Sequence, residues 1–396
     1  MPEVVVVAAR RTPIGKFLGA FSTLSAVDLG AAVVRGMLES AGVEAADVEE
    51  LIFGQARQLG SGPNPARQVA IRSGMSESSP AYTVNKACGS SLKCIDLGRA
   101  AICLDGRKVV VVGGMESMTN IPFLLPQMRQ GYRLGHAKTL DGNYQDGFTC
   151  AILGQPMGNT AENLVDDYGI SRQEQDELAL LSHHRAEAAQ KAGLFTDEIV
   201  PVEVTTRKQT VSVDTDEHVR PGVTLENMAK LPPVFRSAAE GGTVHAGNSS
   251  GITDAASALL LMTREEAARR GLTPLARVGA SSVVGVPPRI MGIGPVPAIQ
   301  ALCEKTGTSL SDYGLIELNE AFAAQAIACY RDLELDTERV NVNGGAIGLG
   351  HPIGATGARI VVTLLHEMQR RGTSRGLASL CMSGGMGMAL AFDSLD

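Results

Sequence analysis

VVVVGGMESM (Val109–Met118) and LASLCMSGGMGMAL (Leu377–Leu390) each run from an apolar stretch into Gly-Gly-Met. Each lies downstream of a segment that begins with asparagine, NKACGSSLKC (Asn85–Cys94) in the first case and NGGAIGLGHPIGATGAR (Asn343–Arg359) in the second. The repetition predicts two similar α/β halves joined by an insertion, which a chain of 396 residues can accommodate. A chance similarity of glycine turns is the alternative.

Short apolar runs surround this repeat and predict buried strands at Val4–Ala9, Val109–Val112 and Leu377–Met382. Apolar residues recur with a period near 3.6 over Asp28–Ala41 and Val361–Arg371, which predicts amphipathic helices. Strands that alternate with helices favour the α/β class, with a largely parallel sheet covered on both faces.

The middle of the chain is richer in polar residues and turns. Ser171–Gly193 is its clearest predicted helix, because Ser171 stands at the N-cap position, Glu174 completes a capping box and Gly193 ends the pattern. We therefore expect an inserted domain over residues 120–247, an N-terminal half over 1–119 with part of 248–270, and a C-terminal half over 271–396.

Composition excludes several classes of protein. A formal net charge of -7 argues against a general nucleic-acid binder, which would carry a basic face. No apolar run approaches the ~20 residues of a membrane span, and the charges at the start follow the apolar run, unlike those of a signal peptide. The seven cysteines form no C-x-x-C pair and no zinc-like spacing, so we expect no metal and a reducing compartment, with cytoplasm as the default.

Three reactive side chains stand in the glycine-rich segments. Cys88 comes at or just before the start of an apolar, helix-compatible stretch, where free backbone amides favour a thiolate. His351 lies in a predicted glycine loop, where an imidazole can serve as acid or base, although a tight turn with an incidental histidine explains the pattern equally well. Cys381 ends a predicted strand and is either buried filler or a group that projects into a site.

Four ordered blocks resemble the signature blocks of the thiolase family of acyl-CoA C-acyltransferases: NKACGSSLK, NEAFAAQ, GGAIGLGHPIGATGAR and CMSGGMG. AARRTPIGKFLG, GGMESM, PMGNTAENL and AGNSSGITDAAS are also similar to that family, so the resemblance runs from about Val4 to Leu390. It implies the thiolase fold, in which two similar α/β halves form a five-layer αβαβα core with an inserted loop domain. It also implies coenzyme A (CoA) and acyl-CoA as substrates, with no covalently bound cofactor.

The resemblance implies a reaction and a role for each reactive residue. Thiolases cleave 3-ketoacyl-CoA with CoA, or condense two acyl-CoA molecules in the reverse Claisen reaction. By similarity, Cys88 carries the acyl group, His351 deprotonates it and donates toward a thioester oxygen, and Cys381 moves the proton at the α-carbon. Asn319 would orient a water in one oxyanion hole, and the backbone N–H groups of Cys88 and Ser383 would form a second.

The resemblance also implies contacts to the substrate. Arg220, in the inserted region, would meet the adenine end of CoA, although a surface arginine in a polar loop explains it as well. Ser250 matches a serine near the pantetheine arm, while Met157 and Phe322 would contact the acyl group. The sequence has no phosphate-binding P-loop or dinucleotide fingerprint, and CoA binding in the family uses neither.

Several positions depart from the family pattern. Ser91 and Ser383 stand where glycine is usual, which predicts a small local adjustment at Ser91 and harder backbone dihedrals at Ser383. DAAS (254–257) replaces the more usual D-G-A. Pro156 replaces the histidine of short-chain biosynthetic members, which favours a thiolase not limited to acetoacetyl-CoA, although acetoacetyl-CoA remains a possible main substrate.

Two rival functions remain open at this point. One is a related condensing enzyme, such as a 3-ketoacyl synthase, although such enzymes lack the Cys381 block. The other is a non-catalytic thiolase-like protein that binds acyl-CoA. The resemblance further implies a role in fatty acid metabolism and a homodimer or homotetramer, with Met128–Gly142 as the protruding loop. Sequence leaves the preferred chain length, the physiological direction and the choice between dimer and tetramer undecided.

Overall fold

The computed structural model describes residues 2–395, and a sheet of ten strands runs through it. The strands follow the order β14, β15, β16, β13, β1, β12, β5, β3, β4, with the short strand β2 beside β12. Their bounds are β1 Val4–Arg11, β2 Gly15–Lys16, β3 Glu50–Gly54, β4 Ala81–Val84, β5 Val109–Ser117, β12 Thr253–Thr263, β13 Ala276–Gly285, β14 Leu315–Leu318, β15 Arg375–Met382 and β16 Met386–Asp393.

The three predicted strands are all present, and each is longer than its apolar core. The sheet is mixed, however, so the expectation of a largely parallel sheet was wrong. Only β3 with β4, β3 with β5 and β14 with β15 pair in parallel. The chain returns antiparallel at the end of each half, where β12 pairs with β5 and β16 pairs with β15.

The two predicted halves are confirmed by the topology. The N-terminal half runs β4–β3–β5–β12–β1 across the sheet, and the C-terminal half runs β14–β15–β16–β13 in the matching order. A parallel bridge from Ile316 in β14 to Val340 stands where β4 stands in the first half. The halves join along β1 and β13, where Val5 pairs with Arg277 and Val6 with Ala276.

The two Gly-Gly-Met segments that suggested these halves do not occupy equivalent positions in them. Gly113 and Gly114 lie inside β5, whereas Gly384 and Gly385 form the turn between β15 and β16. Both turn glycines have φ near +88°, a conformation that side-chain-bearing residues adopt rarely. The repetition therefore identified two strands that correspond, β5 and β15, although their Gly-Gly pairs lie in different local structures.

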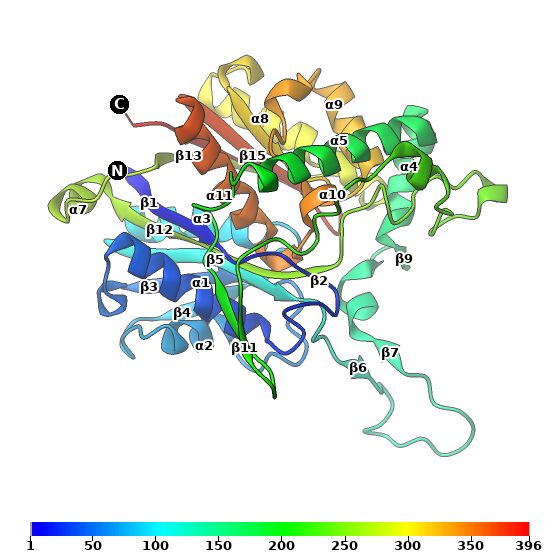
Figure 1. Cartoon of the computed structure of the whole chain (residues 1–396), viewed down its shortest axis with the longest axis horizontal. Coiled ribbons are helices and arrows are strands. Elements are labelled where there is room, and N and C mark those ends of the chain that lie inside the picture. The colour runs from blue at the N-terminus through cyan, green and yellow to red at the C-terminus, as the bar shows by residue number, and fades with distance from the viewer. Residues whose placement is uncertain (1, 396) are drawn as a thin grey trace.

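Alternation of buried side chains along the strands divides the molecule into five layers. In β5, Val110 and Val112 face a central cluster shared with α3 and α11, while Val109 and Val111 face a cluster with α1 and α2. In the second half, β15 and β16 face the same central helices, and their other face packs against α8 and α9. Figure 1 shows α3 and α11 between the two parts of the sheet, as the five-layer expectation requires.

The helices begin where the sequence supplies caps. Ser25 and Ser171 close capping boxes at the starts of α1 and α5, as predicted for Ser171. The bounds are α1 Ala26–Ala41, α2 Pro65–Arg72, α3 Ser90–Leu104, α4 Met157–Tyr168, α5 Arg172–Lys191, α6 Leu225–Ala229, α7 Arg264–Arg269, α8 Pro295–Thr306, α9 Ala323–Asp332, α10 Ala346–Leu349 and α11 Ile353–Arg371. No helix between residues 2 and 395 is long and apolar enough to cross a membrane.

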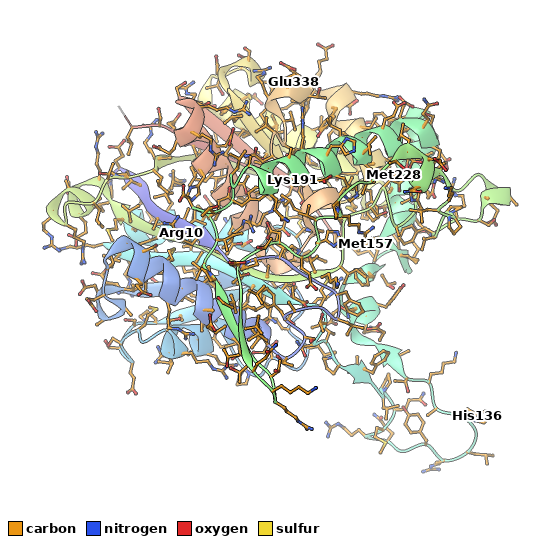
Figure 2. All side chains as sticks on the ribbon, viewed as in Figure 1. Arg10, His136, Met157, Lys191, Met228 and Glu338 are labelled. Carbon is orange, nitrogen blue, oxygen red and sulfur yellow. The ribbon has the colours of Figure 1, made fainter. Side chains whose placement is uncertain are left out.

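Residues 120–247 contribute no strand to the large sheet. They form the helices α4, α5 and α6, the π-helical turn Tyr144–Phe148 and three small hairpins. The hairpins pair β6 Phe123–Leu124 with β7 Leu140–Asp141, β8 Thr149–Cys150 with β9 Gln155–Pro156, and β10 Val202–Thr205 with β11 Thr210–Val213. The segment between β6 and β7 projects from the body, with His136 at its far end (Figures 1 and 2). The domain boundaries expected from sequence stay a prediction.

Candidate active site

Two helices of the central layer begin side by side, and each follows one of the predicted reactive residues. Cys88 lies two residues before α3, and His351 lies two residues before α11. The Ser91 hydroxyl accepts a hydrogen bond from the backbone N–H of Ala358 at 2.9 Å, which ties the first turn of α3 to α11. Neither N-cap residue supplies a side-chain cap, and in the first turn of α11 the backbone N–H of Gly354 donates to the Glu116 carboxylate at 2.9 Å.

The glycines around His351 explain how α11 approaches so closely. A Cβ on Gly357 would lie 2.4 Å from the backbone nitrogen of Leu92 in α3, and one on Gly354 would lie 2.5 Å from the carbonyl oxygen of Met115 in β5. The predicted glycine loop is therefore a loop only up to Pro352, and its second part is the start of a helix that packs against other backbone.

A cavity of about 140 Å³ opens between these elements. Six predicted site residues line it together: Cys88, Met157, Ser250, Phe322, His351 and Ser383. The other lining residues are Ala56, Arg57, Asn85, Ala87, Asp146, Gly147, Phe148, Met291, Ala321 and Ile353. The wall combines a thiol, an imidazole and backbone amides with apolar side chains, which is the usual composition of a small-molecule site.

His351 is held as a neutral base. The Thr356 hydroxyl donates to the carbonyl oxygen of Pro352 at 2.9 Å, so it accepts from Nδ1 of His351 at 2.7 Å. The proton therefore sits on Nδ1, and Nε2 keeps a free lone pair. Burial, and then the positive charges of Arg359 and Arg57, lower the pKa of His351 to about 3.

The environment of Cys88 differs from the sequence-based expectation. Burial raises the pKa of the Cys88 thiol, so the resting group is a thiol and not the thiolate expected beside a helix N-terminus. The backbone N–H groups of Ser383 and of Cys88 itself hydrogen-bond to the sulfur and act in the opposite direction, as does the charge of Arg57. A base beside the thiol is thus needed to generate the nucleophile.

Cys381 and Asn319 are not among the residues that line the cavity. Cys381 is fully buried in a cluster with Met291 and Ala321, against which Met157 and Phe322 pack. Burial raises the pKa of its thiol, so it is protonated at neutral pH. Asn319 follows β14, is buried, and has neither amide atom hydrogen-bonded within residues 2–395.

Arg220 is placed apart from these residues. It is exposed and does not line the cavity. Its charge reaches two buried histidines, His183 and His218, where burial first and Arg220 second lower each pKa to about 4. His218 packs on Gly251, which follows Ser250 in the chain. Because the charge of Arg220 acts on His218, Arg220 lies on the same side of the molecule as the Ser250 segment.

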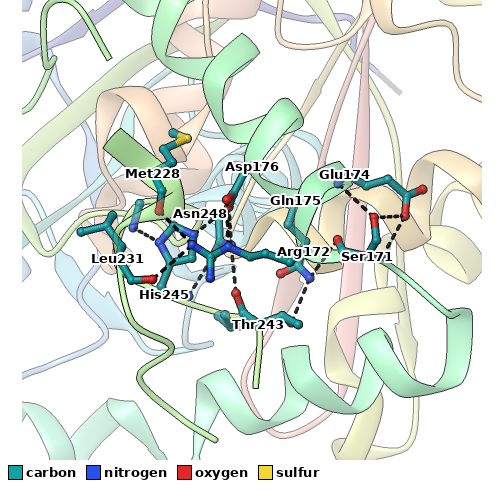
Figure 3. Close-up of polar contacts among 12 residues, drawn as sticks. Ser171, Arg172, Glu174, Gln175, Asp176, Met228, Leu231, Thr243, His245 and Asn248 are labelled. Atoms are coloured by element: carbon teal, nitrogen blue, oxygen red, sulfur yellow. Dashed lines mark hydrogen bonds and ion pairs between the residues drawn. The ribbon is translucent and has the colours of Figure 1, made fainter. Parts of the chain in front are cut away.

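Ser250 reaches the cavity because α5 fixes the segment that precedes it. Asp176 accepts from Nε2 of His245 at 2.7 Å and from the side-chain amide of Asn248 at 3.1 Å, and Gln175 donates to Thr243 at 3.0 Å. Figure 3 shows this network around the N-terminal turn of α5. The inserted region therefore sets the position of one wall of the cavity.

Two backbone contacts then join that segment to the rest of the site. The backbone N–H of Ser250 donates to the carbonyl oxygen of Ala321, and that of His351 donates to Gly251.

Comparison with known proteins agrees with this geometry. The family model described as the thiolase N-terminal domain matches residues 4–265, and the thiolase C-terminal domain matches residues 272–394. The chain belongs to the thiolase family. As a thiolase it is an acyltransferase enzyme, and neither a related condensing enzyme nor a non-catalytic acyl-CoA-binding protein is favoured.

Relatives and solved structures support the assignment over the full length of this thiolase. An acetyl-CoA acetyltransferase of Rhizobium meliloti is 51% identical, with 100% of this chain and 99% of the relative covered. One from Escherichia coli is 49% identical, with both chains covered fully.

Solved structures are similarly close. The acetyl-CoA acetyltransferase of Bacillus anthracis superposes with a TM-score of 0.97 at 45% identity, covering 100% of this chain and 99% of the other. The human mitochondrial 3-ketoacyl-CoA thiolase superposes at 0.95 with 42% identity and the same coverage.

The departures of this thiolase from the family pattern are accommodated. Ser91 is buried and uses its hydroxyl to bind Ala358, so the extra atoms add a contact between α3 and α11. Ser383 is not among the residues with positive φ, because Gly384 and Gly385 carry the left-handed part of the turn. The concern that serine would strain this backbone was therefore wrong.

Several residues of the site were not predicted from the sequence. Arg57, Phe148 and Met291 line the cavity, and Thr356 fixes the His351 ring. Glu116 was quoted within GGMESM, but its role was not recognised: its buried carboxylate accepts from the backbone N–H groups of Ala56, Arg57 and Gly354. The Arg57 segment gave no signal, because one arginine in a polar stretch looks like a surface residue.

No group of three or more His, Cys, Asp or Glu side chains that could hold a metal ion occurs in the described part of the chain.

Proposed function

We propose that this thiolase catalyses CoA-dependent cleavage of 3-ketoacyl-CoA, and the reverse Claisen condensation of acetyl-CoA, through an acyl group carried on Cys88. The observation that supports this most directly is the shared cavity of Cys88, a neutral His351 and the Ser383 amide, with the Cys381 thiol clustered with two residues of its wall. These are the nucleophile, base, oxyanion donors and second proton carrier that the reaction requires.

In cleavage, Nε2 of His351 takes the proton of the Cys88 thiol. The thiolate attacks the 3-keto carbon, an S–C bond forms, and the carbonyl oxygen becomes an oxyanion. We assign the stabilisation of that oxyanion to the backbone N–H groups of Cys88 and Ser383, and their action on the Cys88 sulfur supports the assignment. The bond between C2 and C3 then breaks, and its electron pair leaves with the acetyl-CoA part as an enolate.

Cys381 completes this half of the reaction. Its thiol, kept protonated by burial, gives its proton to C2 of the enolate, and acetyl-CoA is released. CoA then enters as the second substrate. The Cys381 thiolate removes the proton of the CoA thiol, and the CoA thiolate attacks the acyl-Cys88 carbonyl. Cys88 leaves with the electron pair of the broken S–C bond and takes back its proton from Nε2 of His351. In condensation the same steps run backwards, and Cys381 removes the proton from the acetyl group.

The remaining substrate contacts follow from position. Met157, Met291 and Phe322 form the apolar wall that meets the acyl group, and Ser250 meets the pantetheine arm of CoA. Asn319, with two unpaired amide atoms, orients a water at the enolate oxygen. Arg220 binds the adenine end of CoA on the exposed side of the Ser250 segment.

The preferred substrate is a short 3-ketoacyl-CoA. A cavity near 150 Å³ holds a group about the size of benzene, and 140 Å³ therefore suits a four- to six-carbon acyl group. Methionine side chains adapt their shape readily, so Met157 and Met291 allow longer chains to enter at lower rates. This agrees with the breadth expected from Pro156 and with relatives of both named activities.

The test is CoA-dependent cleavage of 3-ketoacyl-CoA substrates from four to sixteen carbons by the purified protein. We expect the highest kcat/KM at four carbons, with a measurable and falling rate at six and eight. Cleavage of the four-carbon substrate alone would sink the idea of breadth. No cleavage at any length would overturn the proposed function and favour an acyl-CoA-binding protein.

The protein assembles as a homodimer or a dimer of dimers and acts in the cytoplasm in fatty acid metabolism. The projecting segment supports assembly, because it carries large apolar side chains in the open, including Leu134 at 99% exposure and Met128. Light scattering after size-exclusion chromatography distinguishes dimer from tetramer, and removal of residues 128–138 is expected to leave a dimer if the loop joins two dimers.

A further inference from the structure

Arg57 is a fully buried arginine in the wall of the active-site cavity, in the loop that follows β3. Its guanidinium carbon lies 4.3 Å from the centre of the Phe148 ring, and Nη1 donates to the sulfur of Met118 at 2.8 Å. Nε and Nη2 have no hydrogen-bond partner within residues 2–395. The side chain is thus held by stacking, with two of its three nitrogens unsatisfied.

Residues of the inserted region hold the Arg57 side chain in place. Gly147, in the π-helical turn Tyr144–Phe148, packs against the guanidinium, and a Cβ there would lie 2.3 Å from Nη2. The ring of Phe148, from the same turn, stacks against the guanidinium as well. Because the arginine is packed from the insertion and anchored on the first half, its charge occupies one position.

No carboxylate oxygen lies within 4.0 Å of the guanidinium nitrogens of Arg57 among the residues that the structure describes. Glu116 is the acid that acts on Arg57 most strongly, but its oxygens accept backbone N–H groups from Ala56, Arg57 and Gly354. Burial raises the pKa of Glu116 to about 7, so it does not carry a full negative charge at neutral pH. Asp146 and Asp141 act on Arg57 more weakly.

A buried cation without an anion is costly, so a residue of this kind requires an explanation. The first anion that the reaction proposed above creates in this cavity is the thiolate of Cys88, and Cys88 and Arg57 act electrostatically on each other. The other ionisable groups that face this sulfur do not compete for the role: His351 is neutral, Cys381 is a thiol, and Glu116 opposes the thiolate.

We propose that Arg57 is a positioning residue whose fixed positive charge stabilises the Cys88 thiolate. The proposal rests on the proposed role of Cys88 as the nucleophile. The charge acts twice in one turnover. It favours the thiolate when His351 removes the proton, and it makes Cys88 a better leaving group when CoA attacks the acyl-enzyme.

The test is the pH dependence of Cys88 alkylation by iodoacetamide, followed by mass spectrometry of the Cys88 peptide in the full-length protein. We compare wild type with Arg57→Leu, Arg57→Gln and Arg57→Lys, and with Arg207→Leu as the matched control. Arg207 is an exposed arginine in the turn between β10 and β11, so its removal changes net charge equally but far from the cavity.

In Arg57→Leu and Arg57→Gln we expect the inflection of the alkylation rate to move up by about one pH unit, with a roughly tenfold slower rate below it. Arg57→Lys is expected to keep most of the wild-type alkylation rate, because lysine keeps the positive charge although it loses the stacking on Phe148. Arg207→Leu follows the wild-type profile. A merely structural role for Arg57 would change the stability of all three variants without moving the inflection.

Profiles of Arg57→Gln and wild type that coincide would overturn the proposal. Circular dichroism and size-exclusion chromatography show which of the two neutral variants, Arg57→Leu or Arg57→Gln, keeps the fold and the assembly state. The alkylation profile of either variant that does so is enough to test the proposal. A preference of wild type for a 3-ketoacyl-CoA that ends in a carboxylate, lost in Arg57→Gln without any change in the profile, would also overturn it in favour of a substrate anion. Alkylation needs no turnover, so a shifted profile in a protein that cleaves nothing would contradict the proposed function alone.

Discussion

The two halves of the molecule share one arrangement of strands and helices but carry different reactive side chains at equivalent places. In the N-terminal half, Cys88 precedes the central helix α3, and in the C-terminal half His351 precedes the central helix α11, each by two residues. The backbone enters α3 through Ala87 at a φ of +48° and Gly89, and enters α11 through Gly350 at +105° and Pro352. The fold supplies two helix starts at one cavity, and the local sequence decides which of them carries the proposed nucleophile and which the proposed base.

The strands beside these helices differ in the same way. Gly114 in β5 pairs with the last residue of β3, and Ser379 in β15 pairs with the last residue of β14. Two residues further along, the first half has Glu116 and the second has Cys381, both fully buried. The carboxyl group binds backbone amides beside Arg57, whereas the thiol lies among apolar side chains. A cation and a buried carboxyl group therefore act on the proposed nucleophile, whereas the proposed acid for the carbon is an uncharged thiol in apolar surroundings.

The largest expected effect comes from removing the nucleophile of the first half. We expect Cys88→Ser to lose acyl-enzyme formation and to lower kcat for cleavage on the order of 10⁴-fold or more. Mass spectrometry after incubation with acetyl-CoA detects the acyl group. Cys94→Ala, in the helix α3 that follows Cys88 but in the hydrophobic core, is the matched control and is expected to keep the acyl-enzyme. An acylated Cys88→Ser protein would disprove the assignment.

The corresponding change in the second half separates the two proton-transfer roles. Cys381→Ser is expected to accept an acetyl group on Cys88 from acetyl-CoA at nearly the wild-type rate, because the Cys88–His351 pair is intact. Making or breaking the carbon–carbon bond should slow by about 10³-fold, since a serine hydroxyl is a far weaker acid than a thiol. Stopped-flow measurement of both steps gives the ratio, and equal wild-type and variant rates for bond cleavage would refute the role.

The next prediction concerns the contact between the halves. Gly357→Ala should lower the free energy of unfolding by about 1–3 kcal/mol, because the added methyl would meet the backbone of Leu92. Urea unfolding measures the change. Gly285→Ala is the control, since its added methyl has no atom closer than 3.9 Å. An equal effect in both variants would mean that α11 can move away from α3 freely.

The smallest effect concerns the orientation of the base. Thr356→Val removes the acceptor that holds the proton on Nδ1 of His351 and should slow cleavage about tenfold. Cys88 alkylation should slow by the same factor, and Thr356→Ser should restore both. A loss that serine does not restore would point to packing and not to the tautomer.

Much of this fold was predictable because its signals are local. Ser171 and Glu174 form the expected capping box, and the apolar runs at Val4 and Val109 are strands. The mixed direction of the sheet was not predictable, because pairing direction depends on contacts far apart in sequence. The glycines after His351 looked like a loop because their function, letting a helix contact backbone of α3 and β5, exists only in three dimensions.

The site shows the same limit. Cys88, His351 and Ser383 stood in recognisable blocks and meet at one cavity. The state of Cys88 did not follow from its helix start, because burial outweighs the local amides. Arg57 was not found, since an arginine is usually a surface residue and only the packing of Phe148 and Gly147 over it reveals otherwise.

The join along β1 and β13 has a further consequence. Two identical copies of one half, placed as these halves are, would form a symmetric pair with the same residue before both central helices. Such a pair could offer two thiols or two imidazoles at the shared cavity, but never one of each. A single chain that contains both halves can mutate one copy without the other. Covalent continuity thereby turns a symmetric scaffold into an asymmetric one, in which each copy is free to evolve its own residue.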